Sequence, residues 1–379
     1  MQGYMKIIVG VGLAILFIFG SWYGYGRLTA DDIELKLRDD EPFGVRIALL
    51  DDEKDDSLEM LLQMTVFPGH KRVCFYFVNT EAFFEDEKKP LREMSASSAD
   101  RFESYTGIAS DYTMTLKKKD AVRLLNLVEG VSHFVDQPVF LENARFQYPR
   151  GVRRFSGEQV LEYVLGREKT DRKKKELLAS IDRLFRQESV VLNLFWRLAL
   201  YKKQVTSAPL KAFMADLIDT GMTDMELNSL AAFLSSGVHA GVLEVPLEAK
   251  NVGKRDQLLQ VKDKRARGLF QNYRDGLKST NKPVYTMEVL NGTETPRLAR
   301  RVKQFMRDKG PTVLSTGNYE YKPLPTTVIV DRAGNTFHAH LLARKTRTKR
   351  ARVFFRRRAM LVNSTFILGN DFKLKNLRL

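Results

Sequence analysis

The densest group of chemically active side chains lies between residues 344 and 358, where nine of fifteen residues are cations. Such a density of guanidinium and ammonium groups is typical of a surface that binds a polyanion, and the interleaved rings of Phe354 and Phe355 favour nucleic acid. The alternative is a solvated helix and strand surface with no ligand. The cations are Arg344, Lys345, Arg347, Lys349, Arg350, Arg352, Arg356, Arg357 and Arg358.

Other reactive side chains show weaker patterns. The acidic residues between 51 and 56 could bind a cation, but a solvated loop is the simpler interpretation. His338 and His340 alternate as they would on a strand, yet no carboxylate and cysteine framework accompanies them, so we predict no metal site. The single cysteine, Cys74, stands in the apolar run 73–77 and is expected to be a packed thiol.

The basic run is part of a wider charge asymmetry. Residues 1–150 contain 18 Lys and Arg against 24 Asp and Glu, a net charge of −6. Residues 151–379 contain 44 basic and 22 acidic residues, a net charge of +22. The second half is therefore expected to face a polyanion, an anionic membrane or phosphate groups, unless its charge serves solubility.

An apolar segment near the amino terminus predicts where these charges are displayed. From Met5 to Gly26 the only charged residue is Lys6, so the segment is long enough to cross a bilayer as a single helix. Aromatic residues at 22, 23 and 25 suit the membrane interface. We expect a signal anchor in the cytoplasmic membrane, with the amino terminus inside and the bulk of the chain extracytoplasmic, on the periplasmic or cell-wall side. A cleaved signal peptide is the weaker alternative, because bulky aromatics follow the apolar core.

This location changes the interpretation of the basic run 344–358. No nucleic acid is expected outside the cytoplasm. Contact with anionic lipid headgroups or with acidic envelope polymer then becomes the expected role, beside the solvated surface already named.

The elements that would position these groups begin after a polar, acidic stretch at 27–44, which predicts a short tether. Alternating apolar runs then predict strands, two of them joined as a hairpin across Pro68-Gly69. An amphipathic helix is predicted at 119–128. The predicted strands are 45–50, 58–67, 72–78, 112–116 and 131–135.

Capping residues predict the later helices. Ser156 precedes a helix over 157–166, and the spacing of Thr223 and Glu226 predicts a capping box before another. Residues 249–282 are rich in charged and polar side chains and are expected to close the first domain and link it to the next. A second, small α/β domain follows, with a helix at 297–309. Its predicted strands are 285–290, 311–315, 326–330 and 365–368.

Two parts of the chain resemble known families. Residues 45–275 resemble the LytR-CpsA-Psr (LCP) domain. The match is best in Phe155-Ser-Gly-Glu-Gln-Val-Leu-Glu-Tyr-Val164, which is similar to the family's Leu-Asn-Gly-Glu-x-Ala-Leu-x-Tyr-Val motif. Residues 284–372 resemble the LytR carboxy-terminal domain through Val289-Leu-Asn-Gly-Thr293 and Ile367-Leu-Gly-Asn-Asp371.

The resemblance implies an α/β architecture: one transmembrane helix, an α/β/α domain with a central mixed sheet, and a small α/β domain. The predicted segments are a cytoplasmic stub and anchor at 1–26, the tether at 27–44, the LCP-like domain at 45–275, a linker at 276–283 and the LytR carboxy-terminal-like domain at 284–379.

LCP proteins transfer a glycopolymer phosphate from a polyprenyl pyrophosphate carrier to peptidoglycan or another acceptor. The resemblance therefore implies arginines at the pyrophosphate, because the planar guanidinium binds phosphate oxygens in pairs. It also implies a divalent cation such as Mg²⁺ held by carboxylates and an apolar cleft for the lipid tail.

The chain departs from that pattern at most charged positions. Leu165 and Thr80 stand where the resemblance places arginines, and Leu58 stands where it places an aspartate. Arg167 and Glu81 keep one arginine and one carboxylate.

The later arginine motif of the family is also changed. Lys174 is a partial substitute for one arginine, and Leu177-Leu178 replace the final Arg-Gln. Arg183 or Arg186-Gln187 could reach the same space. The candidate catalytic residues are Arg167, Lys174 and Glu81, and the candidate phosphate-binding residues are Arg167, Arg172, Lys174 and Arg183.

We therefore expect a catalytically degenerate envelope protein that binds or scaffolds lipid-linked polymer, peptidoglycan or an envelope protein complex. The alternative is an active phosphotransferase, and Mg²⁺ is expected only in that case; no other cofactor is predicted. A third possibility is a pure interaction module of a membrane machine, with the basic second domain as its docking surface.

Overall fold

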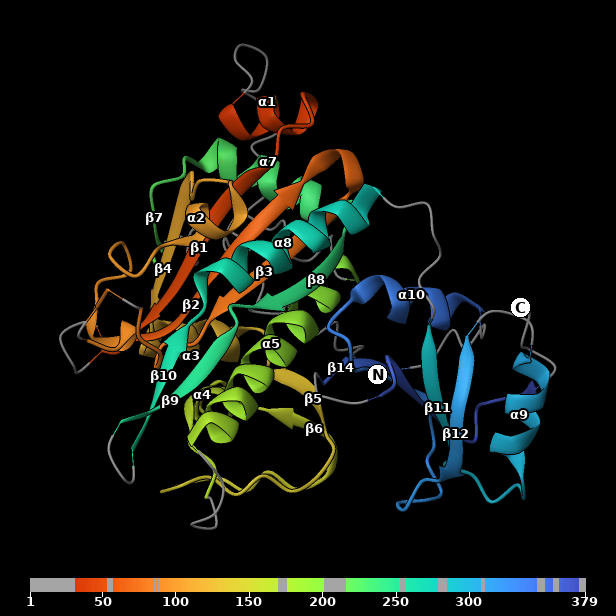
Figure 1. The fold of residues 1–379 in the computed structure, drawn as a ribbon. Helices are drawn as coiled ribbons and strands as arrows, with labels where there is room; N and C mark the ends of the chain where they lie inside the picture. Colours follow the sequence, from red (N-terminus) through yellow and green to blue (C-terminus); the bar gives the residue numbers. More distant parts are fainter. Residues whose placement is uncertain are drawn as a thin grey trace, which may run out of the picture.

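A six-stranded sheet forms the centre of the first domain (Figure 1). The computed structural model describes residues 31–52, 57–84, 86–87, 89–169, 176–200, 216–252, 256–278, 285–307, 311–345, 352–356 and 361–374. In spatial order the strands are β7 (Asp219–Thr220), β4 (Tyr112–Lys117), β1 (Phe43–Leu50), β2 (Leu58–Phe67), β3 (Arg72–Val78) and β8 (His239–Glu244). The sheet is mixed, because the pairs β1–β4 and β3–β8 are parallel and the other pairs are antiparallel.

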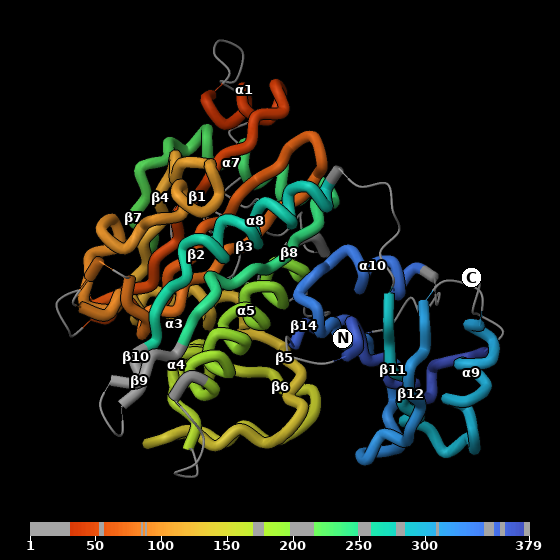
Figure 2. The backbone as a smooth tube through the Cα atoms, viewed as in Figure 1, coloured from red at the N-terminus to blue at the C-terminus, as the bar shows by residue number. Residues whose placement is uncertain are grey.

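Side chains alternate along each strand, so each strand contributes to both faces of the sheet, and both faces are apolar. Val73, Phe75 and Phe77 of β3 enter the core on one face, and Cys74 and Tyr76 enter the core on the other. The thiol of Cys74 is buried, as expected. Helices cover both faces (Figure 2), and the predicted α/β mixed-sheet fold is confirmed. The first core includes α3 (Lys118–Leu127), α4 (Gly157–Leu165), α5 (Glu176–Leu200) and α7 (Asp224–Leu234), and the second includes α2 (Phe102–Thr106) and α8 (Asp263–Lys278).

Capping residues fix the starts of α4 and α7, as the sequence predicts. The Ser156 hydroxyl accepts a hydrogen bond from the amide of Gln159, whose side chain accepts one from the amide of Ser156. Thr223 and Glu226 form the same reciprocal pair at α7. The hairpin β2–β3 turns through a short 3₁₀ helix at Pro68–His70.

The described part of the predicted tether is a packed helix, α1 (Asp32–Arg38). Ile33 is fully buried in the main core, and Lys36 forms an ion pair with Asp111 at 3.2 Å. The acidic residues were expected to keep this stretch in solvent. In α1, however, Asp32 and Glu34 are exposed while Ile33 is buried. The predicted anchor lies outside the described residues, and within the described ranges no helix is both long and apolar enough to cross a membrane.

Residues 249–282 contain more structure than a linker. An antiparallel hairpin of β9 (Leu247–Val252) and β10 (Asp256–Val261) leads into α8. Phe270 of α8 is buried, and the Tyr76 hydroxyl donates to the carbonyl of Ala266 at 3.0 Å. This helix was missed because its apolar residues are sparse among charged ones.

The second domain has a five-stranded sheet. Its helices are α9 (Leu298–Met306) and α10 (Thr336–Lys345). In spatial order its strands are β12 (Thr312–Asn318), β11 (Thr286–Asn291), β15 (Ser364–Leu368), β13 (Val328–Asp331) and β14 (Arg352–Phe355). The strand placement of His338 and His340 is wrong, since both lie on α10, where their rings pack against Tyr285 and His239 respectively.

The second domain docks on the first through buried polar contacts. The Phe355 amide donates to Asn193 Oδ1 at 2.9 Å, and the Phe355 carbonyl lies 2.8 Å from Asn193 Nδ2. Arg332 pairs with Asp136 at 2.7 Å. The Phe355 side chain belongs to the main core of the first domain. Asp136 and its neighbours lie beside the hairpin of β5 (Val131–Val135) and β6 (Gly151–Phe155).

Candidate functional site

Three of the predicted site residues meet beside the first domain's sheet. Glu81 follows the carboxyl end of β3, Arg167 follows α4, and Arg183 lies in α5. Arg167 Nη2 lies 2.7 Å from Glu81 Oε1, and Arg183 Nη1 lies 3.3 Å from the same oxygen. One carboxylate therefore pairs with both guanidinium groups.

Burial and the neighbouring positive charges shift the pKa of Glu81 in opposite directions. Burial by itself would raise the pKa of its carboxyl, but Arg183 and Arg167 outweigh burial, and that pKa lies below its ordinary value. Arg183 exposes 10% of its side chain and Arg167 exposes 55%. Separating Glu81 from the buried Arg183 would leave an uncompensated charge, which is costly.

A cleft of about 760 Å³ opens at this cluster. Its volume suits a small ligand or one end of a larger one. Two arginines, Arg92 and Arg183, and three glutamates, Glu59, Glu81 and Glu93, give its wall a net charge of −1. The other lining residues are Ser57, Leu58, Thr80, Met94 and Ser95.

The substituted positions are filled by groups that do not bind phosphate strongly. The Thr80 hydroxyl donates to the carbonyl of Glu59 and lies 3.3 Å from Arg183 Nη2. Leu58 presents an apolar wall to the cleft. Leu165 packs against the main core.

Sequence reasoning missed Glu59, Arg92 and Lys118. No motif marks them, because they come from three separate segments that only the fold brings together. Lys118 Nζ lies 3.0 Å from Asp51 Oδ2 and 3.4 Å from Glu59 Oε1. Burial alone would lower the pKa of Lys118, but the two carboxylates raise it above its ordinary value, so the ammonium is a lasting partner for them.

These residues do not fit a Mg²⁺ ion. The two carboxylates already hold the Lys118 ammonium, which a divalent cation would have to displace. Within the described ranges, no group of three or more possible ligand side chains could hold a metal.

Arg186 does not reach the cleft. Its side chain is fully buried and ties down the loop after α4: Nε donates to the Tyr163 carbonyl at 2.7 Å, and Nη2 donates to the Gly166 carbonyl at 2.6 Å. Nη1 pairs with Glu168. Arg186 therefore positions the segment that carries Arg167. Arg186 itself is not available to a ligand.

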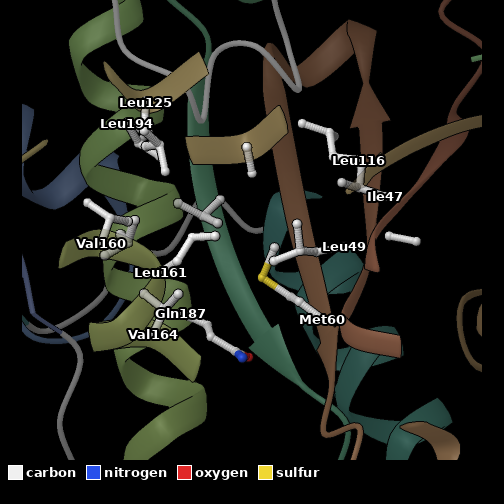
Figure 3. Close-up of a pocket in the computed structure, with 14 residues that line it drawn as sticks. Ile47, Leu49, Met60, Leu116, Leu125, Val160, Leu161, Val164, Gln187 and Leu194 are labelled. Carbon is white, nitrogen blue, oxygen red and sulfur yellow. The ribbon is translucent and has the colours of Figure 1, made fainter. Parts of the chain in front are cut away.

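An apolar cavity lies between the sheet and helices α4 and α5 (Figure 3). Leu49, Met60 and Val160 point into it, and Gln187 is the single polar residue in its lining. Its volume of about 50 Å³ is smaller than the roughly 150 Å³ of an engineered cavity that holds benzene. A polyprenyl chain therefore does not fit unless the two helices move away from the sheet.

The remaining predicted residues are placed only in part. Arg172 and Lys174 lie outside the described residues. In the basic run, Arg344 and Arg352 are exposed, whereas Arg356 lies 3.8 Å from Asp136 at the contact between the domains. The side chain of Lys345 and all of Arg347, Lys349, Arg350, Arg357 and Arg358 lie outside the described residues.

Comparison with known proteins identifies the second domain by sequence. Residues 285–372 match the family described as LytR cell envelope-related transcriptional attenuator. No curated protein shows significant sequence similarity to the chain.

Comparison with solved structures identifies the fold of the rest. Protein gbs0355 from Streptococcus agalactiae matches with a TM-score of 0.52 and 15% identity, over 65% of this chain and 92% of its own. A protein from Eubacterium siraeum matches with a TM-score of 0.50 and 12% identity, over 68% and 97%. The LytR-Csp2A-Psr enzyme from Actinomyces oris matches with a TM-score of 0.49 and 13% identity, over 61% and 89%. The LytR carboxy-terminal domain at the predicted place is confirmed by sequence, and the α/β fold of the first domain is shared with the solved structures from S. agalactiae and E. siraeum.

Proposed function

We propose that this chain is a cell-envelope protein whose LCP-like domain has lost phosphotransferase activity. Residues 1–26 would anchor it in the cytoplasmic membrane and leave the bulk of the chain outside. Its role would be to bind or scaffold lipid-linked polymer, peptidoglycan or an envelope protein complex. The LCP-like fold and the LytR carboxy-terminal domain support the envelope assignment, and the uncharged segment from Ile7 supports the anchor.

The pairing of Glu81 with both Arg167 and Arg183 carries this proposal. A pyrophosphate group needs guanidinium groups that can bind it, and here one carboxylate already pairs with both Arg167 and Arg183. A charge-assisted hydrogen bond contributes roughly 1.5–3 kcal/mol. Losing two such contacts would slow transfer by roughly 10²- to 10⁴-fold.

Lys118 adds independent support for lost activity. Its ammonium pairs with Asp51 and with Glu59, one of the three glutamates that line the cleft. A fixed ammonium supplies one positive charge and offers no open coordination position, so it does not replace a divalent ion at a leaving phosphate.

An active phosphotransferase is the second candidate function. One observation favours it: the cleft is large, and Arg92 and Arg183 both line it. Under this alternative a carrier pyrophosphate would displace Glu81 from the arginines, and Arg167 would swing toward the ligand.

Release of polyprenyl phosphate from a polyprenyl-pyrophosphate-linked glycan tests the two candidates. The full-length protein in detergent would be incubated with the carrier, Mg²⁺ and purified peptidoglycan, beside an Arg167→Ala variant. We expect no release above the protein-free background from either protein. Turnover by the wild type that Arg167→Ala abolishes would establish the phosphotransferase and reject the scaffold.

A further inference from the structure

Helix α9 of the second domain has one buried face and one strongly basic face. Its buried face is apolar, with Leu298, Ala299, Val302 and Met306 in the domain core. Between residues 297 and 307 there are five cations and no carboxylate. All five are exposed: Arg297, Arg300, Arg301, Lys303 and Arg307.

These cations have almost no partners in the part of the chain that the structure describes. Lys303 Nζ donates to the Leu314 carbonyl at 3.3 Å. None of the four arginines forms an ion pair with a described carboxylate. Solvated surfaces usually mix the two signs of charge, so five cations on α9 and its two cap positions, none with a described counter-charge, make a local field that attracts anions.

The geometry of the face suits a linear polyanion. Successive α-helical residues rise 1.5 Å, so the side chains from 297 to 307 span about 15 Å. Four of the five are guanidiniums, which bind phosphate oxygens in pairs, whereas lysine acts as a point charge. A row of arginines therefore favours repeated phosphate groups over repeated carboxylates.

The position of α9 in the molecule decides between two sources of phosphate. Helix α9 lies at the opposite end of the molecule from α1 (Figure 1). Only residues 27–31 separate α1 from the proposed anchor, and five extended residues reach about 17 Å, so the α1 end must lie next to the bilayer. The α9 face then points away from lipid headgroups and toward envelope polymer.

We infer that the exposed face of α9 binds a phosphate-bearing anionic polymer of the envelope. The inference rests on the proposed extracytoplasmic location but not on the chemistry of the cleft, because the α9 residues belong to the other domain.

Binding of a labelled poly(glycerol phosphate) by the full-length protein in detergent tests this inference. The variant Arg300→Glu/Arg301→Glu should bind about tenfold more weakly or worse, and the slope of its log affinity against log salt should fall by about two. The matched control is Lys264→Glu/Arg265→Glu on α8, an exposed pair with the same change of charge. It should bind like the wild type, and both variants should melt at the wild-type temperature.

Four results would overturn the inference. The α9 variant could keep wild-type affinity, or the α8 control could lose as much. Tighter binding to phosphatidylglycerol vesicles than to the polymer would assign the face to a lipid surface. Equal binding of polyglutamate would remove the preference for phosphate. Since the α9 variant leaves the cleft intact, none of these results bears on polyprenyl phosphate release.

Discussion

At the scale of single residues, Glu81 decides what the cleft can hold. It pairs with both Arg167 and Arg183, and it is one of three glutamates in the wall. The resemblance predicted Glu81 and Arg167 because both stand in recognisable motifs. Arg92 was not predictable, since it reaches the cleft from a loop with no motif and only through the packing of that loop.

The pKa of Glu81 gives a prediction for stability. A carboxyl whose pKa is lowered in the folded state stabilises the fold above its unfolded pKa, and this contribution is lost as the pH falls through the folded value. The unfolding free energy of the wild type should exceed that of Glu81→Gln at neutral pH, and the difference should shrink steadily below about pH 4.5.

Chemical denaturation of both proteins across that pH range measures this difference. Glu93→Gln is the control, because Glu93 also lines the cleft but is exposed and forms no ion pair within the described ranges. A difference between wild type and Glu81→Gln that stays constant with pH would contradict the account.

At the scale of elements, α5 connects the cleft to the second domain. Residues 183–195 of this helix are all buried, which is unusual for a helix at the side of a sheet. The reason is that α4, β5 and β14 all pack against α5, and β14 covers it around Asn193. A buried chain of contacts follows: Asn193 lies 2.9 Å from His133, whose ring lies 3.3 Å from the Tyr163 hydroxyl.

Replacing Asn193 should weaken the contact between the domains. Asn193→Leu would leave the amide and carbonyl of Phe355 and the His133 ring without their partner, at a cost of about 2–5 kcal/mol in unfolding free energy. Urea denaturation of the full-length protein measures the loss. The exposed substitution Asn272→Leu on α8 should change little, and an equal effect of both substitutions would show that Asn193 has no special role.

Elements with regular patterns were predicted, and elements without them were not. Alternation fixed β1 to β5, and capping boxes fixed the starts of α4 and α7. Helix α10 was not predicted, because the alternation of His338 and His340 suits the period of a strand and not that of a helix. Its start is set by a turn in which Asp331 Oδ1 accepts from the amides of Gly334 and Asn335.

At the scale of the whole molecule, the two domains share a core. Ala339 and Phe355 of the second domain lie in the main core of the first, and Arg332 forms a buried pair with Asp136. The sequence predicted two domains and a linker but not the contact between the domains. That contact uses the backbone amide and carbonyl of Phe355, and a pattern of side chains cannot predict it.

Removal of the second domain should therefore destabilise the first. A chain ending at Lys278 would expose the face of α5 that β14 now covers, together with Asp136 and Asn193. We expect a lower melting temperature and binding of an apolar dye by the shortened chain. An unchanged melting transition of the first domain would contradict a shared core.

The central claim is that the cleft is closed to pyrophosphate by the protein's own carboxylate. The most direct test is calorimetric titration of the full-length protein with inorganic pyrophosphate and Mg²⁺, for the wild type and Glu81→Gln. The wild type should show no binding up to millimolar ligand, and Glu81→Gln, in which the carboxylate no longer pairs with Arg167 and Arg183, should bind at least about tenfold more tightly. Micromolar binding by the wild type that Arg167→Ala weakens would contradict the claim.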